Sequence, residues 1–427
     1  MQTMTRREML MTTGAAGLGL AAMPGSLFAA ARPSPSLIHR LKHPVAIAMW
    51  DFSWLQRRHP GGGFERWEQV LDELVERGYN AVRIDAFPHL LALPGRKLAE
   101  QITFPGDPNG RLWGNDVDIT VNPRTALVEF LNACQKRDVY VELSTWLNGA
   151  TGAPEVIGFE GLVKAWEETI DFLETQGLMD NILFIDLLNE YPYWNNFNWL
   201  KQQAVAAGSR AGVNLDTANI HIQDNRDVGL TAAGRQYYRE FSTRLLQHFR
   251  ARYPQHGFAL SFTVNWDFFH PEICLDMKAM DVLDAHVWFS HNALLQPFDM
   301  GGARRLAPDQ RRKHYAELKE VWAAKRDELT AWMGESIKTF AALGRKTGAV
   351  VGNTEGWGCV GWDEVEGLDW EFIKQSAEIA VGLALAADYK FICTSNFTHP
   401  HFHSLWQDVE WHQRITACIK AGAAHPI

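Results

Sequence analysis

Eight short apolar runs, separated by longer amphipathic stretches, constrain the fold of this chain more than any other feature. The clearest run covers 182–188, and its lack of polar alternation is typical of a strand buried on both faces. It ends in Asn189 and Glu190, and Pro192 helps to stop it. The eight predicted strands cover 45–50, 80–87, 139–146, 182–190, 258–264, 282–289, 349–357 and 391–396.

Helical patterns lie between these runs. The apolar residues Phe64, Trp67, Val70 and Leu74 recur at helical spacing, and Gly78 follows as a stop signal. Helices are predicted near 64–77, 123–136, 161–175, 235–252, 308–343 and 370–387, with a last helix closing the chain.

Strand–helix alternation predicts parallel strands, and eight units predict an α/β fold of the (β/α)8 TIM-barrel type, with 45–427 as a single catalytic barrel. A doubly wound open sheet is the alternative, but no Gly-x-Gly-x-x-Gly turn follows the first strand. The long loops follow the second, fourth, sixth and seventh strands, on the face that carries active sites in barrels. We expect 191–234 to be an insertion with short helices.

The first residues carry an export pattern rather than part of the fold. Arg6 and Arg7 precede a Gly/Ala-rich apolar segment, which resembles a twin-arginine signal. We expect a signal peptide over 1–31, a linker over 32–44, and a mature protein that is periplasmic or secreted and not held in a membrane. A chance Arg-Arg pair in a cytoplasmic protein is the alternative.

Composition excludes some classes of function. The net charge is −9 without a basic tract, which argues against a nucleic-acid partner. The five cysteines form no Cys-x-x-Cys pair, so we expect buried thiols rather than a zinc or redox site. Oligomeric state stays open.

The residues at the predicted strand ends combine indoles, amides and carboxylates. Amides and carboxylates hydrogen-bond hydroxyl groups, and indoles stack on sugar rings, so the set predicts an oligosaccharide or glycoside site. Some of the tryptophans can instead fill the core. The candidate substrate-binding residues are Asp51, Trp54, Arg83, Trp146, Asn189, Asn265, His286, Trp288, Trp357 and Asn396.

Two glutamates at strand ends supply the candidate catalytic pair. Glu190 follows the fourth run and Glu355 lies in the seventh. Hydrolysis of a glycosidic bond needs a proton for the departing oxygen and a negative charge near the anomeric carbon, and two carboxyl groups provide both. Either residue alone could be a loop salt bridge, but the joint occurrence is more specific.

These residues resemble the clan of retaining (β/α)8 glycoside hydrolases that includes the cellulase-like, family 5 enzymes. The resemblance implies that Glu190 is the acid/base, Asn189 binds the sugar 2-hydroxyl, and Glu355 is the nucleophile. It further implies that Arg83 lies near the nucleophile and keeps it ionised. His286 is similar to the histidine of the sixth strand in that clan.

Three positions depart from the clan's pattern. The sixth strand reads His286-Val287-Trp288 where His-x-Tyr is usual, and the third strand lacks a common histidine. Asn396-Phe397 stands where a tryptophan is often found. The sugar therefore cannot be carried over from the resemblance.

The sequence thus predicts a retaining hydrolase that cleaves β-linked glycosides by double displacement, without a cofactor or metal. A carbohydrate-binding pseudo-enzyme is one alternative, because a fold does not determine a function. A metal-dependent hydrolase is a weaker one, raised by the alternating His399, His401 and His403.

Overall fold

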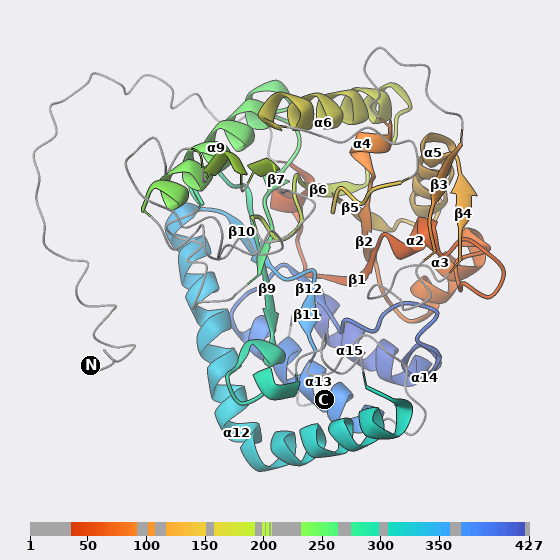
Figure 1. Cartoon of the computed structure of the whole chain (residues 1–427), viewed down its shortest axis with the longest axis vertical. Helices are drawn as coiled ribbons and strands as arrows, with labels where there is room; N and C mark the ends of the chain where they lie inside the picture. Colours follow the sequence, from red (N-terminus) through yellow and green to blue (C-terminus); the bar gives the residue numbers. More distant parts are fainter. Residues whose placement is uncertain are drawn as a thin grey trace, which may run out of the picture. The chain divides into compact units, whose positions relative to one another are not determined.

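Parallel strands form the centre of the molecule (Figure 1). This computed structural model describes residues 36–91, 101–106, 117–150, 158–192, 199–200, 202–204, 206, 232–263, 275–298, 306–358 and 369–422, which all belong to one compact unit. The central strands are β1 (Val45–Asp51), β2 (Ala81–Asp85), β5 (Tyr140–Ser144), β6 (Ile182–Asp186), β7 (Phe258–Ala259), β8 (Phe262–Thr263), β9 (Val282–Trp288), β10 (Val350–Gly352), β11 (Gly356–Trp357) and β12 (Phe391–Cys393).

The strands close into a barrel. One parallel sheet has the order β12-β1-β2-β5-β6-β7, and β9 pairs with β8, β10 and β11 in another. Backbone hydrogen bonds join the two sheets at both edges: Asp281 donates to Phe258 over 3.1 Å, and Cys393 donates to Asn353 over 2.8 Å. The predicted (β/α)8 fold is confirmed.

Helices surround the strands on the outside (Figure 1). In α3, Trp67, Val70, Leu71 and Leu74 are buried on one face, as the helical spacing predicts. The helices are α2 (Ser53–Gln56), α3 (Trp67–Glu76), α4 (Pro88–Leu91), α5 (Pro123–Gln135), α6 (Gly158–Thr175), α9 (Ala232–Arg252), α12 (Pro308–Thr347), α13 (Trp370–Ala386), α14 (His403–Trp406) and α15 (Val409–Ala421), with short 3-10 turns η1 (Leu37–Arg40), η3 (Phe289–His291) and η4 (Gln296–Phe298).

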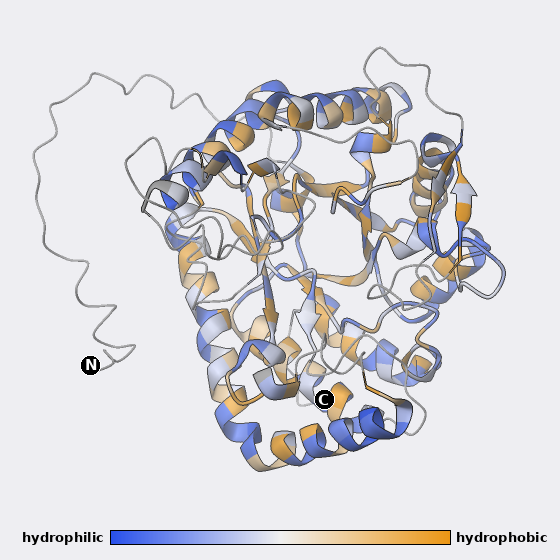
Figure 2. Cartoon of the chain, viewed as in Figure 1, coloured by the Kyte–Doolittle hydropathy of each residue, from blue (hydrophilic) through white to orange (hydrophobic). Residues whose placement is uncertain are grey.

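The barrel strands are hydrophobic and the outer helices alternate between polar and apolar residues (Figure 2). The interior nevertheless contains charge. Arg83, Glu142, Asp186, Asp284 and His286 have no exposed surface. Barrel interiors are usually filled by branched apolar side chains, and buried charges are costly unless they are paired, so a charged layer indicates function.

Two predicted strands are interrupted. The fifth was expected over 258–264 but divides into β7 and β8, and the seventh was expected over 349–357 but divides into β10 and β11. In each gap a backbone N–H bonds to a buried side-chain carboxylate of the neighbouring strand and not to the backbone of that strand: Ser261 N–H to Asp186 over 2.7 Å, and Thr354 N–H to Asp284 over 2.9 Å. The prediction of continuous strands was wrong at these two places.

Other outcomes are local. The loop after β2 contains an unpredicted antiparallel hairpin, β3 (Ile102–Phe104) with β4 (Ile119–Val121). The predicted insertion 191–234, and Cys274, Cys359 and the segment 1–35, lie wholly or largely outside the described residues.

Cys134 and Cys393 are buried free thiols, as predicted, and Cys418 is half-buried. Within the described chain, each helix is too short or too polar to cross a membrane.

Candidate active site

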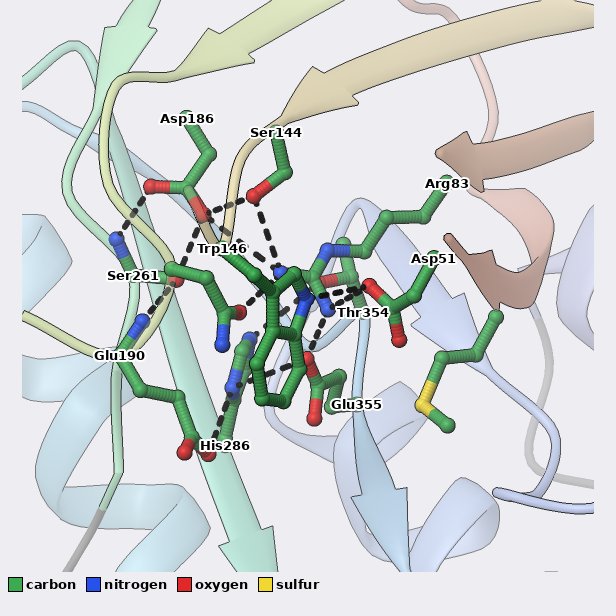
Figure 3. A network of polar contacts seen from close by, with 12 residues as sticks. Asp51, Arg83, Ser144, Trp146, Asp186, Glu190, Ser261, His286, Thr354 and Glu355 are labelled. Carbon is green, nitrogen blue, oxygen red and sulfur yellow. Dashed lines mark hydrogen bonds and ion pairs between the residues drawn. The ribbon is translucent and has the colours of Figure 1, made fainter. Parts of the chain in front are cut away.

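Glu190 and Glu355 meet at the carboxyl ends of the barrel strands (Figure 3). Glu190 follows β6, and Glu355 lies between β10 and β11. Each offers an oxygen atom within 4.8 Å of the other and of a ring nitrogen of His286. The two residues are only 5% and 1% exposed, so the pair lies in a largely water-excluded site.

Arg83, on β2, is the cation at the centre of the site. Its NH1 contacts both Glu355 and, at 2.9 Å, Asp51, while its Nε lies 3.2 Å from Glu142. Its NH2 donates to Asn189. Burial lowers the pKa of Arg83, but the surrounding carboxylates outweigh it and raise the pKa well above its usual value. One guanidinium therefore orients groups from several strands.

Three buried aspartates connect neighbouring strands in the same manner. Asp186 accepts hydrogen bonds from Ser261 N–H at 2.7 Å and Ser261 Oγ–H at 2.6 Å. Asp284 accepts from Thr354 N–H at 2.9 Å and Thr354 Oγ–H at 2.5 Å. Asp85 accepts from Trp146 N–H at 2.9 Å. We call these the aspartate clamps; each fixes the next strand near its carboxyl end.

The Asp186 clamp determines the backbone at Glu190. Ser261 Oγ accepts the Glu190 N–H over 2.9 Å while donating to Asp186. Glu190 has φ +47°, a left-handed conformation that non-glycine residues seldom adopt. Such a conformation persists where neighbouring contacts impose it, and it is common at functional sites.

His286, on β9, stands between carboxylates. Its Nδ1 lies 3.0 Å from Glu190 Oε1 and 3.7 Å from Glu355 Oε1. Its Nε2 lies 3.5 Å from Asp284 Oδ2. Burial lowers the pKa of His286, but the charges of Glu355 and Asp284 raise it well above its ordinary value.

The buried carboxylates outnumber the cations that face them, and burial raises the pKa of several. Burial raises the pKa of Glu355 to about 8, against the lowering effects of Arg83 and His286. Burial likewise raises the pKa of Glu142 well above its usual range and that of Asp186 to about 6. The protonation state of the site therefore depends on carboxyl groups from several strands.

The structure brings most of the predicted polar residues together. In addition to the pair and Arg83, Trp146 Nε1 donates to Asp51 over 3.2 Å. Four buried atoms of the predicted site residues have no hydrogen-bond partner among the described residues: Asn189 Nδ2, Asp51 Oδ2, and Oδ1 and Nδ2 of Asn396.

Two of the predicted tryptophans donate their indole N–H groups to backbone carbonyls, and Asn265 lies outside the described residues. Trp54 packs against Trp67 and Phe130 and donates its indole N–H to Asp85 O. Trp357 donates to Cys393 O over 2.8 Å, and it is next to Trp288 in the register of β11 and β9. These contacts are structural.

Sequence reasoning missed Glu142, Asp186 and Asp284. A signal was present, because each is an acidic residue within an apolar run. A buried carboxylate is costly unless it bonds to something.

The histidine cluster was considered as a metal site. His399 and His401 have ring centroids 5.1 Å apart, but in the described chain the side chains close enough to share a metal ion are Glu190, His286 and Glu355.

Fold and site together define a glycoside hydrolase-type (β/α)8 barrel. The model of one family, described as "Sugar-binding cellulase-like", matches residues 47–420. The chain belongs to this cellulase-like family.

One solved structure agrees with this assignment. The crystal structure of a provisionally assigned glycoside hydrolase from Parabacteroides distasonis ATCC 8503 is 31% identical, with 90% of this chain and 95% of that chain covered and a TM-score of 0.72. An endocellulase from Pyrococcus horikoshii is 13% identical, with 87% and 92% covered and a TM-score of 0.45, too distant to bear on activity. No curated protein matches the chain.

Proposed function

We propose that this protein is a retaining glycoside hydrolase that cleaves β-linked glycosides or oligosaccharides by double displacement. The observation that carries the proposal is the closeness of Glu190 and Glu355: one oxygen atom of each lies within 4.8 Å of one oxygen atom of the other. Retaining enzymes hold their two carboxyl groups about 5–5.5 Å apart, whereas inverting enzymes need about 6.5–9.5 Å to admit a water molecule.

The two steps follow from the surroundings of each residue. Glu355 attacks the anomeric carbon and the bond to the leaving oxygen breaks, while Glu190 gives that oxygen its proton. Glu190 then takes a proton from water, the water oxygen bonds to the anomeric carbon, and the bond to Glu355 breaks. Arg83 contacts Glu355 and favours its ionised form, which the attack requires.

The unpartnered atoms would hold the sugar. Asn189 already gives its oxygen to Arg83, so its Nδ2 is left to donate to a hydroxyl beside the anomeric carbon. Asp51 Oδ2 is a buried acceptor for another hydroxyl. A buried polar atom without a partner costs about 1–3 kcal/mol, so a hydroxyl that bonds it is favoured.

Intact mass after incubation with 2-fluoro-sugar fluorides tests the proposal. The fluorine slows the second step, so a gain of one sugar in mass, absent in Glu355→Gln, identifies the nucleophile and the accepted sugar. Absence of any adduct, together with no hydrolysis of a panel of aryl β-glycosides, would refute the proposal and leave a carbohydrate-binding barrel.

We further propose that the twin-arginine pattern exports the protein. Arg6 and Arg7 precede the apolar segment as this route requires. Changing both to Lys keeps the charge and should retain the full-length chain inside the cell, whereas the wild type is recovered outside the inner membrane. Equal fractions of both proteins in the periplasm or medium would exclude this route.

A further inference from the structure

A histidine with a carboxylate at each edge of its ring lies in the middle of the site, and Figure 3 shows it between Glu190 and Glu355. On β9, Asp284 and His286 are two residues apart, so both side chains point to the barrel interior. Asp284 Oδ2 lies 3.5 Å from Nε2, and Glu190 Oε1 lies 3.0 Å from Nδ1.

Neutral imidazole does not suit this position. It carries one N–H. Even when Glu190 holds the proton of the acid, the ring has Asp284 at one edge and Glu355 at the other, so one of these two carboxylates would face a lone pair. Imidazolium donates at both edges. The titratable groups that act on the ring are, besides Asp284, the carboxyls of Asp51, Glu142, Glu190 and Glu355 and the imidazole of His291, whose pKa burial lowers to about 4.

Asp284 is itself held by the strand that carries the nucleophile. Both of its oxygen atoms accept from Thr354, at 2.9 Å from the backbone and 2.5 Å from the hydroxyl. Thr354 directly precedes Glu355. The counter-ion of His286 is therefore fixed relative to the catalytic carboxylate and cannot turn away.

We propose that Asp284 is a positioning residue that keeps His286 as an imidazolium, so that one fixed positive charge serves both catalytic carboxylates in turn. This inference rests on the proposed function. In the first step the negative charge is on Glu355; once Glu355 is esterified, it is on Glu190, which then acts as the base. His286 Nδ1 lies within 3.7 Å of both and need not move.

Histidine NMR on protein labelled in its imidazole rings tests the charge directly, with His286→Gln used for assignment. We expect the wild-type His286 to stay protonated from pH 5 to 9, and Asp284→Asn to titrate within that range. Asp85→Asn is the matched control, because it changes an equally buried aspartate clamp that has no histidine. It should leave the His286 titration unchanged.

Kinetics supply a second readout if the protein cleaves glycosides. In Asp284→Asn the second step should slow by about 10²-fold. Glycosyl-enzyme should accumulate, kcat and KM should fall together, and the alkaline limb of the pH profile should move to lower pH.

The inference would be overturned if His286 were neutral at pH 8 in the wild type, a measurement that needs no variant. It would also be overturned if the titration of His286 were unchanged in Asp284→Asn. These NMR outcomes do not depend on turnover, so a protein that cleaves no sugar would refute the proposed function separately.

Discussion

The surroundings of Glu355 and Glu190 differ, although the two side chains face the same space. Glu355 Oε1 contacts two cations, the guanidinium of Arg83 and, at 3.7 Å, the imidazole of His286. Glu190 meets His286 at 3.0 Å, and its own backbone is fixed by Ser261 in a left-handed conformation.

The difference indicates how one kind of residue takes two roles. A nucleophile has to be negative when substrate binds. Burial raises the pKa of Glu355, and the two cations at its Oε1 counteract that rise. An acid/base has to gain and lose a proton, so it needs exact placement more than a permanent ion pair. In this molecule charge is concentrated at Glu355, and backbone restraint is concentrated at Glu190.

Replacement of Glu355 should have the largest effect. Glu355→Ala removes the attacking oxygen, so turnover should fall by about 10⁴-fold or more while far-UV circular dichroism is unchanged. Azide should enter the vacated space, attack from the same face, and give an α-glycosyl azide detectable by NMR. Turnover equal to that of the wild type would remove Glu355 from the role.

Replacement of Glu190 should depend on the leaving group. Glu190→Ala should lose about 10²- to 10⁴-fold with poor leaving groups and much less with activated aryl glycosides, which depart without a proton. Here azide attacks the glycosyl-enzyme from the opposite face, so the product should be the β-glycosyl azide. The α-azide from this variant would mean that the two roles are reversed.

Removal of Arg83 tests the concentration of charge. Arg83→Met leaves Asp51, Glu142, Asp186 and Glu355 without their shared cation. Loss of one partner from a buried ion pair costs about 3–5 kcal/mol, which urea unfolding would measure. Because Arg83 lowers the pKa of Glu355, the acid limb of the activity profile should also move to higher pH. An unchanged acid limb would contradict the idea that the charge of Arg83 acts on Glu355.

The pH dependence of stability gives a smaller, signed effect. Burial raises the pKa of Glu355 from 4.5 to about 8, so its folded form binds a proton more tightly than the unfolded chain does. The resulting stabilisation is complete below about pH 4.5 and is lost as pH rises through 8. Glu355→Gln should not lose stability in this way, because an amide does not titrate.

The free energies of unfolding from urea titration should therefore be similar for Glu355→Gln and the wild type at pH 5. At pH 9 the value for the variant should be higher, by an amount on the order of a few kcal/mol. The other buried carboxyls are present in both proteins, so the difference reports Glu355 together with its coupling to Asp51 and Glu190. If the difference in free energy of unfolding between the variant and the wild type shrinks as pH rises, the raised pKa of Glu355 is refuted.

The barrel could be predicted because its signals are local. Apolar runs and helical periodicity lie within each segment, and chain order alone places the strand ends on one face. Glu190, Arg83 and His286 were chosen as candidates for that reason. The interruptions at Ser261 and Thr354 could not be, since they depend on carboxylates far away in the sequence.

The tryptophans show a second limit of prediction. Trp54 follows a predicted strand and Trp146 ends one, yet Trp54 packs among outer-helix aromatics while Trp146 bonds to Asp51. A short irregular segment carries no periodicity from which a side-chain direction can be derived. Asp186 and Asp284 gave the opposite error, because acidic residues inside apolar runs were not weighed as a signal of a polar interior.

The smallest effect concerns the restraint at Glu190. Ser261→Ala removes the acceptor of the Glu190 N–H but keeps the Ser261 backbone bond to Asp186. We expect a loss of about 1 kcal/mol in stability and a fall of about tenfold in kcat with poor leaving groups, because a hydrogen bond of ordinary strength orients the acid. Ser261→Thr retains the hydroxyl and is the control. A uniform loss across leaving groups, or an equal loss in Ser261→Thr, would show that the bond supports the barrel and not the proton transfer.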